Sequence, residues 1–381
     1  MIQRHSYIKK LKDAIRRTSV VSMLGPRQCG KTTLARLLEK EYQAVFFDLE
    51  SPQDQMRLQN PELMLGALKG LVIIDEIQIM PELFGILRVL VDRTENKTKF
   101  LILGSASPHI IKNVSETLAG RAEFIELTGF DYIETGENRD YINTLWLRGS
   151  FPRSYLSDSL EDSLAWREGF IRTFLERDIP QLGITIPAIA MRRFWTMLAH
   201  YHGQTLNASE IGRSLGLSDK TIRSYLDILT GTYMMRQLLP WYENIGKRQV
   251  KAPKIYFRDV GILHSLLTIT DMDSLMVNPR LGASWEGFAL EQVLRILQPA
   301  DAYFWATYSG AELDLLFFKH GKKYGIEFKF NEAPKLTKSM RIAVKDLSLT
   351  HLWVVHPGKH MFPVEKHISM LPLHQISKIA F

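Results

Sequence analysis

The feature that most restricts the fold of this chain is an eight-residue segment, GPRQCGKT, at residues 25–32. An apolar run, 20–24, comes directly before it, and a helix-like segment begins at Lys31. Glycines in such a loop let the backbone turn its N–H groups inward, where they and the helix N-terminus can hold a phosphate. A strand, this loop and a helix in succession therefore predict a phosphate-binding loop in a parallel sheet.

Each loop residue has an expected part in binding ATP with Mg²⁺. Lys31 is expected to reach the β- and γ-phosphates, and Thr32 to place its hydroxyl on Mg²⁺. The alternative is a glycine turn without a ligand, and the flanking strand and helix count against it. The predicted nucleotide-binding residues are Gly25, Pro26, Arg27, Gln28, Cys29, Gly30, Lys31, Thr32, Thr33 and Asp75.

Two acidic residues follow a second apolar run. Residues 71–74 read Leu-Val-Ile-Ile, and Asp75 and Glu76 come next. Because ligands of parallel sheets collect at the carboxyl ends of the strands, both side chains are expected at the nucleotide. Asp75 would hold Mg²⁺ through water, and Glu76 would act as general base on the attacking water. A pair of solvated acids ending a strand is the alternative.

Further polar residues are candidates for contacts to the γ-phosphate. Ser105 ends the next apolar strand and could sense the γ-phosphate or orient the water, with Ser107 as second candidate. Arg121 precedes the last predicted strand and could neutralise transition-state charge, within one subunit or across an interface. Arg148 and Arg177 are alternative candidates for that role. For each of these arginines, a surface or ion-pair role is at least as well supported as a catalytic one.

Cys29 is the single cysteine of the chain, which excludes an intramolecular disulfide and favours a reducing cytoplasm. Its place at a helix N-terminus suggests a lowered thiol pKa, so that oxidation or alkylation would block nucleotide binding. The favoured alternative is a variable position that tolerates any side chain.

Hydrophobic residues make up 45% of the chain, yet no apolar run approaches the roughly 20 residues of a membrane helix.

Residues 205–229, TLNASEIGRSLGLSDKTIRSYLDIL, predict a helix-turn-helix, with the turn at Gly216 and an N-cap at Ser218. In DNA readers the start of the second helix meets base edges, and a basic wing contacts phosphates. The net charge of +7 permits DNA binding without establishing it, and a packing module is the alternative. The predicted DNA contacts are Lys220, Thr221, Arg223 and Ser224 on the helix, and Lys247, Arg248, Lys251 and Lys254 in a β-hairpin wing.

Acidic residues and a lysine recur in the C-terminal part. Glu286 begins a helical pattern, Asp314 lies in a strand pattern, and Glu327 and Lys329 belong to the next strand, IEFK. Since side chains alternate along a strand, Glu327 and Lys329 share a face. Carboxylates and a lysine that converge in this way can hold Mg²⁺ or Mn²⁺ and activate water for phosphodiester hydrolysis.

With these motifs the chain resembles the bacterial and archaeal AAA-like ATPases that carry a C-terminal DUF4143 domain. The resemblance implies an ATPase core, a helical lid, a winged-helix-like segment and a nuclease-like C-terminal fold. It covers nearly the whole chain, through GPRQCGKTTL (25–34), IDEIQ (74–78), LGSAS (103–107), LAGR (118–121), RGSFP (148–152) and LERDI (175–179).

The C-terminal motif is similar to that of the PD-(D/E)xK nucleases. This similarity implies that Asp314 and Glu327 are metal ligands, that Lys329 orients the nucleophile, and that Glu286 is an added helix carboxylate. The residue before Asp314 is Leu313 rather than proline. An inert fold used for binding or assembly is the alternative to an active nuclease.

Together these patterns predict an α/β chain with a P-loop NTPase sheet (1–130), a helical lid (131–204), a winged helix-turn-helix (205–279) and a PD-(D/E)xK-like domain (280–381). The expected function is ATP hydrolysis coupled to DNA binding or processing, in the cytoplasm and away from membranes. The alternatives are a DNA-binding nucleotide switch with an inert nuclease fold, such as a regulator or a defence or toxin-linked factor, and a protein-remodelling scaffold ATPase. Expected ligands are ATP, Mg²⁺ and DNA, with Mn²⁺ as an option at the nuclease-like site and a homo-oligomer or protein partner as a further option.

Overall fold

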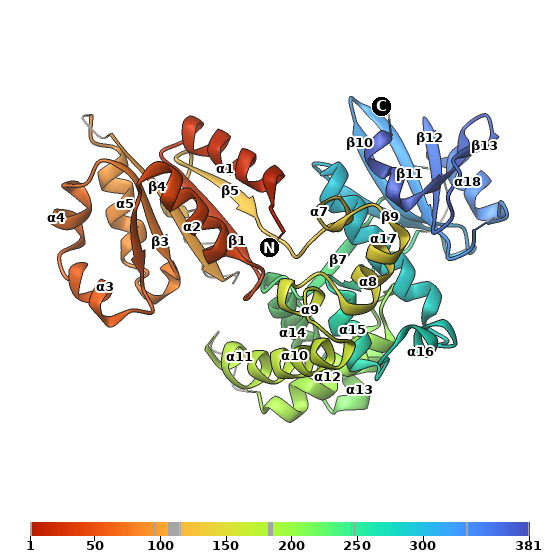
Figure 1. The fold of residues 1–381 in the computed structure, drawn as a ribbon. Coiled ribbons are helices and arrows are strands. Elements are labelled where there is room, and N and C mark those ends of the chain that lie inside the picture. Colours follow the sequence, from red (N-terminus) through yellow and green to blue (C-terminus); the bar gives the residue numbers. More distant parts are fainter. Residues whose placement is uncertain are drawn as a thin grey trace. The chain divides into compact units, whose positions relative to one another are not determined.

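The computed structural model describes residues 2–94, 97–105, 114, 116–181, 186–244, 246, 249–332, 334–379 and 381. The chain divides into two compact units (Figure 1). The first comprises Met1–Gly129 with Gly231–Tyr233, and the second comprises Phe130–Thr230 with Met234–Phe381.

The first unit is built on a parallel five-stranded sheet with the strand order β2-β3-β4-β1-β5. Its strands are β1 (Val20–Gly25), β2 (Val45–Asp48), β3 (Gly70–Asp75), β4 (Thr98–Ser105) and β5 (Ala122–Glu126). The central strands are continuous apolar runs because a parallel sheet is buried on both faces. The predicted parallel sheet is confirmed.

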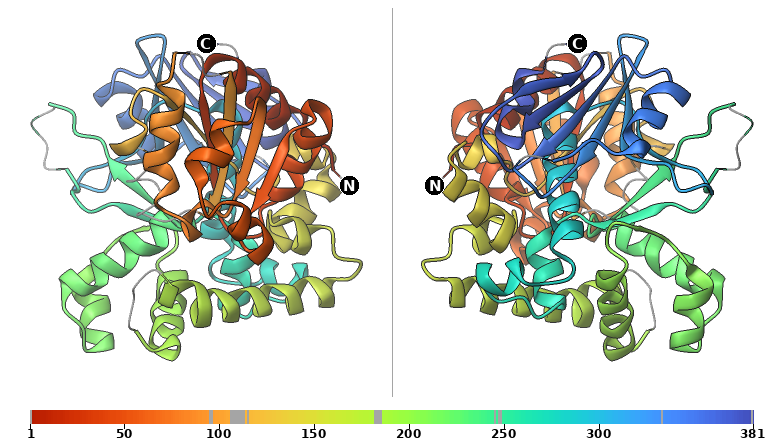
Figure 2. Two further views of the ribbon diagram at one scale, coloured as in Figure 1. Left: turned by 90° about the vertical axis from the view of Figure 1, so that its left-hand side faces the viewer. Right: turned by 90° about the vertical axis from the view of Figure 1, so that its right-hand side faces the viewer.

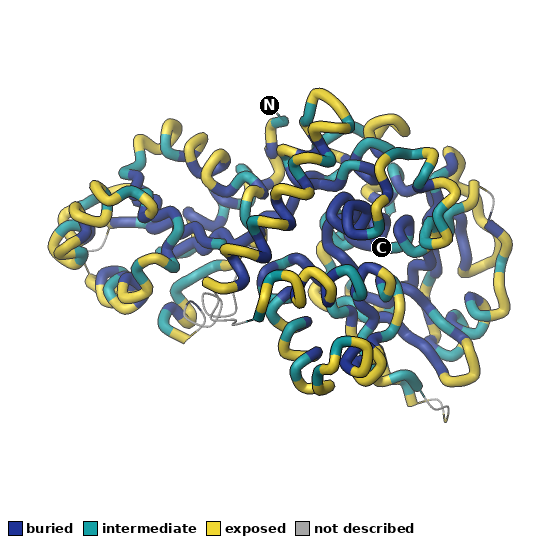
Figure 3. Tube along the Cα trace, turned by 90° about the horizontal axis from the view of Figure 1, so that it is seen from below, coloured by how far each residue is buried: buried dark blue, intermediate teal, exposed yellow. Residues whose placement is uncertain are grey.

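Helices cover both faces of this sheet (Figure 1). They are α1 (His5–Arg17) and α2 (Lys31–Tyr42) on one face, and α3 (Pro52–Arg57), α4 (Pro61–Gly66) and α5 (Leu83–Val91) on the other. Because side chains alternate along a strand, Val21 and Met23 of β1 join the core with α1 and α2, whereas Val20 and Leu24 join the core with α5. In Figure 3 the buried parts of the trace are dark blue and the exposed parts are yellow.

The second unit begins with helices. They are α7 (Tyr132–Thr135), α8 (Arg139–Arg148), α9 (Pro152–Tyr155), α10 (Leu160–Thr173), a π-helical turn (Phe174–Asp178), α11 (Ile179–Gln181) and α12 (Ala188–His200). After them come α13 (Ala208–Leu215), α14 (Asp219–Gly231), α15 (Val260–Leu266), α16 (Met272–Met276), α17 (Leu281–Leu297) and α18 (Lys338–Asp346). Among the helices that the structure describes, none combines the length and the apolar character that crossing a bilayer requires.

The second unit also contains a nine-stranded mixed sheet, with the order β13-β14-β12-β11-β10-β9-β7-β8-β6. Its strands are β6 (Gln204–Thr205), β7 (Met235–Pro240), β8 (Lys254–Phe257), β9 (Ala302–Ala306), β10 (Glu312–Lys319), β11 (Lys322–Phe328), β12 (His351–His356), β13 (Phe362–Glu365) and β14 (Ile368–Pro372). Leu239 of β7 pairs with Tyr303 of β9. The strands that follow α14 therefore join the C-terminal strands in one continuous sheet (Figure 2).

The helices α13 and α14 are joined by a tight turn. Gly216 ends α13 in the left-handed conformation, at φ +68°, and the Thr221 amide donates to the Ser218 hydroxyl at 3.1 Å. A Cβ atom at Gly212 would lie 2.6 Å from the Leu217 carbonyl oxygen, so only glycine allows this close approach. The predicted turn at Gly216 and the cap at Ser218 are both present.

Candidate functional site

The loop between β1 and α2 has the backbone of a phosphate cradle. Gly30 adopts φ +99° and Gln28 φ +62°, which bends the loop before α2 begins at Lys31. A Cβ atom at Gly25 would lie 2.2 Å from the Leu127 carbonyl oxygen, so glycine is required where β1 meets the loop. The amides at the start of a twelve-residue helix are thereby left facing the loop, a ready site for an anion.

The side chains of Lys31 and Thr32 meet this loop from the first turn of α2. The Lys31 ammonium is buried and donates to the carbonyl oxygens of Gly25 at 3.2 Å and Pro26 at 2.9 Å. The Thr32 hydroxyl donates to Asp75 Oδ2 at 2.7 Å. The structure thus brings together residues from β1, α2 and β3 that are as far as 50 positions apart in the sequence. Arg27, Gln28 and Thr33 lie at its partly exposed or exposed rim.

Asp75 is the acidic centre of the site. Only 3% of the residue is exposed, and its Oδ1 accepts a hydrogen bond of 2.9 Å from the Glu76 amide. Burial raises the pKa of Asp75, the nearby Glu76 charge raises it further, and the hydrogen bond from Thr32 opposes both. A hydroxyl beside a buried carboxylate is a pair of hard oxygen donors that fits Mg²⁺.

Glu76 follows Asp75 in a strained backbone conformation. Its φ of +55° lies in the left-handed region, which is rare for a residue with a side chain. Such strain persists where the surrounding structure enforces it and is frequent at functional sites. One Glu76 carboxylate oxygen accepts from the Gln78 amide, which orients the side chain beside Asp75.

Ser105 ends β4, the strand that lies between β1 and β3. It pairs in register with Gly25, the first residue of the loop. Its hydroxyl oxygen is buried and has no hydrogen-bond partner among the described residues. The strand order thus places a free hydroxyl between the phosphate loop and Asp75. The second candidate, Ser107, lies outside the described residues.

The prediction that Arg121 acts at the nucleotide of its own subunit is wrong. The residue precedes β5, and its carbonyl accepts from the Val20 amide at the amino edge of the sheet, opposite the loop. Its guanidinium instead forms two hydrogen bonds with Asp92, at 2.6 and 2.8 Å. Of the competing arginines, Arg148 donates to the Ser157 carbonyl at 2.6 Å, and Arg177 pairs with Asp178 at 3.2 Å.

The predicted lowering of the Cys29 thiol pKa is wrong. The side chain is fully buried, and this burial raises the thiol pKa despite the nearby Lys31 charge. A Cβ atom at Gly25 would come within 2.9 Å of the Cys29 sulfur, so the thiol packs closely against Gly25. Cys29 therefore supports the loop from behind.

Sequence reasoning missed Arg4, which binds the back of the loop. Its guanidinium is buried and donates to the carbonyls of Cys29 at 3.4 Å, Thr128 at 2.8 Å and Gly129 at 3.1 Å. It also lies over the Tyr7 ring, 4.5 Å from the centroid. No sequence motif links Arg4 to Cys29, 25 positions later in the chain. Only the amphipathic pattern of α1, the helix that follows Arg4, could have indicated that it packs here.

Most of the predicted DNA-contacting residues that the structure describes lie at the surface of the second unit. Lys220, Arg223 and Ser224 are exposed on α14, and Lys251 is exposed before β8. Thr221 is half-buried and belongs to the cap with Ser218. Lys247 and Arg248 lie outside the described residues. The prediction for Lys254 is wrong, because its side chain is only 4% exposed and is held by carboxylates.

The predicted metal site of the C-terminal part is not supported. Asp314, Glu327 and Glu286 lie near one another, but the Lys254 ammonium contacts Asp314 at 3.1 Å and Glu286 at 3.2 Å. Lys329 pairs with Glu327 at 2.7 Å. Among the residues that the structure describes, no group of three or more His, Cys, Asp or Glu is arranged to hold a metal ion. We therefore derive no metal-dependent cleavage from this cluster.

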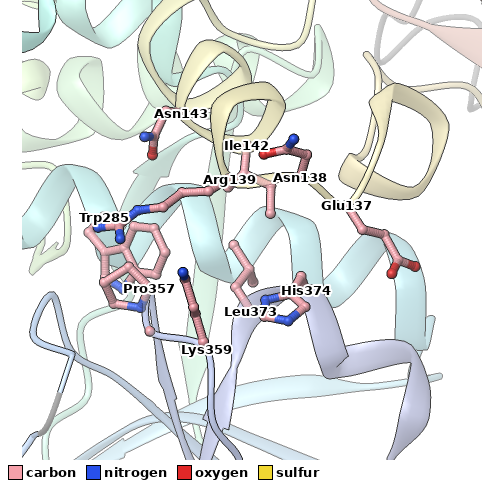
Figure 4. A pocket seen from close by; sticks show the side chains of 11 residues that line it. Glu137, Asn138, Arg139, Ile142, Asn143, Trp285, Pro357, Lys359, Leu373 and His374 are labelled. Atoms are coloured by element: carbon pink, nitrogen blue, oxygen red, sulfur yellow. The ribbon is translucent and has the colours of Figure 1, made fainter.

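A cavity of about 310 Å³ does exist in the second unit, at a different place (Figure 4). Its walls include the first turn of α8, Trp285 of α17 and the chain that follows β12. Arg139 and Lys359 give it a basic rim, and His374 and Glu137 also line it. Neither the acidic cluster nor the exposed face of α14 contributes to its lining.

Three family models match successive parts of the chain. Residues 17–136 match an AAA domain, residues 139–273 match a domain of unknown function (DUF8612), and residues 281–376 match a domain of unknown function (DUF4143). The first match covers the sheet and the phosphate loop described above.

Two curated relatives match nearly the whole chain. Uncharacterized proteins of Mycobacterium tuberculosis and Mycobacterium bovis are each 50% identical to this chain over 376 residues, 99% of this chain and 85% of the relative. A Walker-type ATPase of Pyrococcus abyssi has a similar fold, with a TM-score of 0.51 at 14% identity, over 70% of this chain and 96% of that chain. The chain belongs to the family of these mycobacterial proteins, and in this chain an AAA domain with a P-loop NTPase fold is followed by a C-terminal DUF4143 domain.

Proposed function

We propose that this chain binds ATP with Mg²⁺, hydrolyses it, and uses the nucleotide state to control DNA binding by the α13–α14 helix pair. The observation that carries the proposal is the meeting of Lys31, Thr32 and Asp75 at the mouth of the parallel sheet. There a buried ammonium, a hydroxyl and a carboxylate lie at the first turn of a helix whose amides face the loop.

In this proposal, Lys31 exchanges its hydrogen bonds to the Gly25 and Pro26 carbonyls for the β- and γ-phosphates. Thr32 and Asp75 hold Mg²⁺, which supplies charge neutralisation for the phosphates. Glu76 accepts a proton from the attacking water, and the Ser105 hydroxyl orients that water or the γ-phosphate. The left-handed backbone of Glu76 supports this role, because strain of this kind is frequent at functional sites.

DNA binding is proposed for the exposed start of α14. Lys220 and Arg223 lie within the first five residues of that helix and are exposed, as a recognition helix requires. Two acidic residues on the same helix are engaged locally, since Asp219 accepts from Ser209 at 2.5 Å and Asp227 accepts from Gln237 at 2.9 Å. The basic side chains are therefore available for phosphates.

A protein-docking role for the same segment is the second candidate. The observation in its favour is the pairing of β7 with β9, which makes the strands beside α14 part of a larger sheet. In that case the ATPase would act on a protein partner, and DNA would neither bind tightly nor stimulate hydrolysis.

The experiment is to measure duplex-DNA binding and DNA-stimulated ATP hydrolysis over a range of salt concentrations. The test variant is Lys220→Ala with Arg223→Ala, and the matched control is Lys322→Ala with Lys366→Ala, which removes the same charge from exposed positions elsewhere. The proposal predicts that DNA affinity falls at least about tenfold in the test variant alone. In that variant the slope of log affinity against log salt concentration should also become shallower, by about two released ions. Equal affinity of the two variants, or an affinity independent of salt, would favour protein docking.

A further inference from the structure

Two elements of the second unit, α17 and β10, bring acidic side chains to one ammonium group on β8. Lys254, the first residue of β8, places its Nζ 3.1 Å from Asp314 Oδ1 and 3.2 Å from Glu286 Oε1, and it also contacts Glu312. Glu312 and Asp314 are two positions apart on β10 and so share a face, while Glu286 reaches in from α17. The lysine stem passes the Phe304 ring, with Nζ 5.8 Å from its centroid.

Other donors also contact the carboxylates of this cluster. The Tyr256 hydroxyl donates to Glu286 Oε1 at 2.6 Å, and the Phe328 amide donates to Asp314 Oδ2 at 3.0 Å. Glu327 Oε1 pairs with Lys329 at 2.7 Å. Glu327 Oε2 is buried without a hydrogen-bond partner among the described residues.

The acids around Lys254 keep it charged. Burial alone would lower the pKa of Lys254, but the surrounding acids, Glu286 foremost, raise it well above its ordinary value. Lys254 is therefore an ammonium that faces Glu286, Asp314 and the half-exposed Glu312.

We infer that Lys254 is a built-in cation that takes the place of a divalent metal among Glu286, Glu312 and Asp314. A divalent cation collects about six oxygen ligands. An ammonium at hydrogen-bond distance from the same carboxylates occupies that volume and supplies a single positive charge. The acidic residues of the nuclease-like sheet thereby become a structural clamp that fixes β8 to β10 and α17.

The inference is tested by Mn²⁺ binding, measured by electron paramagnetic resonance and by the shift in melting temperature, in the full chain without nucleotide. The parent and Lys329→Met both retain Lys254. In each of them, Asp314→Asn is therefore expected to leave the Mn²⁺ signal and the melting temperature with Mn²⁺ unchanged. Lys254→Met leaves three carboxylates without their cation, so it is expected to gain one Mn²⁺ site and a rise in melting temperature of about 5 °C at saturating metal. Adding Asp314→Asn to Lys254→Met is expected to abolish both.

Two results would overturn the inference. One is Mn²⁺ binding by the parent chain that Asp314→Asn removes, since the lysine would then not exclude the metal. The other is a folded Lys254→Met variant that gains no site. If Lys254→Met fails to fold with or without Mn²⁺, the comparison of the parent with Asp314→Asn can still overturn the inference, because both retain Lys254.

Discussion

The hydroxyl of Thr32 donates a 2.7 Å hydrogen bond to Asp75 Oδ2, which ties the first turn of α2 to the end of β3. This pair forms the proposed Mg²⁺ site, so Asp75→Asn should weaken Mg²⁺-dependent ATP binding by at least about tenfold, whereas ATP binding without Mg²⁺ should change little. Calorimetric titration with ATP, with and without Mg²⁺, measures the difference. Equal losses under both conditions would show that Asp75 supports the fold of the loop and does not hold the metal.

Glu76→Gln separates nucleotide binding from hydrolysis. Glutamine retains the shape and the contact with Gln78 but cannot take a proton, so ATP hydrolysis should slow about 100-fold or more while ATP affinity is retained. The matched control is Glu82→Gln, an exposed carboxylate before α5 that should hydrolyse like the parent. Parent-like turnover by Glu76→Gln would remove Glu76 from the role of base.

Cys29 should react slowly with thiol reagents in the folded chain. Because only the thiolate reacts and burial raises the pKa of this thiol, labelling near pH 7 should be about 100-fold slower than for an exposed cysteine. In denaturant, the labelling rate of Cys29 should rise to that of a free thiol. As Cys29 is the single cysteine, absorbance with a disulfide reagent reports on it alone. Rapid labelling of the folded chain would contradict the buried position.

The acidic cluster predicts a specific dependence of stability on pH. Glu327 has an ordinary pKa of 4.5 and a folded-state pKa of about 8, chiefly because of burial. Between these values the folded state binds more protons than the unfolded state, so the contribution of this group to stability falls as the pH rises from about 4.5 to about 8. Glu327→Gln should flatten this slope, whereas Glu365→Gln, an exposed control on β13, should not.

Tryptophan fluorescence during urea unfolding measures this effect. All seven tryptophans lie in the second unit, so the signal reports on the unit that contains Glu327. The two variants and the parent are compared at pH 5, 6, 7 and 8. The same slope of unfolding free energy against pH in the parent and both variants would show that Glu327 stays ionised in the folded state.

The phosphate site could be predicted from sequence because each of its parts is local. Continuous apolar runs mark the buried strands, and the residues that follow them must lie at one edge of a parallel sheet. The same rule exposes the error over Arg121: it precedes β5, so a parallel sheet places it at the opposite edge from the loop. The backbone strain at Glu76 has no sequence signal, since glutamate adopts that φ only under tertiary constraint.

The C-terminal cluster could not be predicted in the same way. The sequence indicates Glu286, Asp314 and Glu327 but not Glu312. The role of Lys254 depends on partners 32 and 60 positions away, Glu286 and Asp314. In the sequence this lysine has the same setting as Lys251, a basic residue before a strand, although one is buried and the other exposed. Only the pairing of β8 within the nine-stranded sheet distinguishes them.

The most direct test of nucleotide binding at the loop is calorimetric titration of the parent, Lys31→Ala and Arg36→Ala with Mg-ATP. Arg36→Ala removes a cation from the exposed side of the same helix and serves as the control. We predict one Mg-ATP per parent chain, parent-like affinity for Arg36→Ala, and a loss of at least about 100-fold for Lys31→Ala. The same dissociation constant for Lys31→Ala and the parent, with both chains folded, would contradict a phosphate site at this loop.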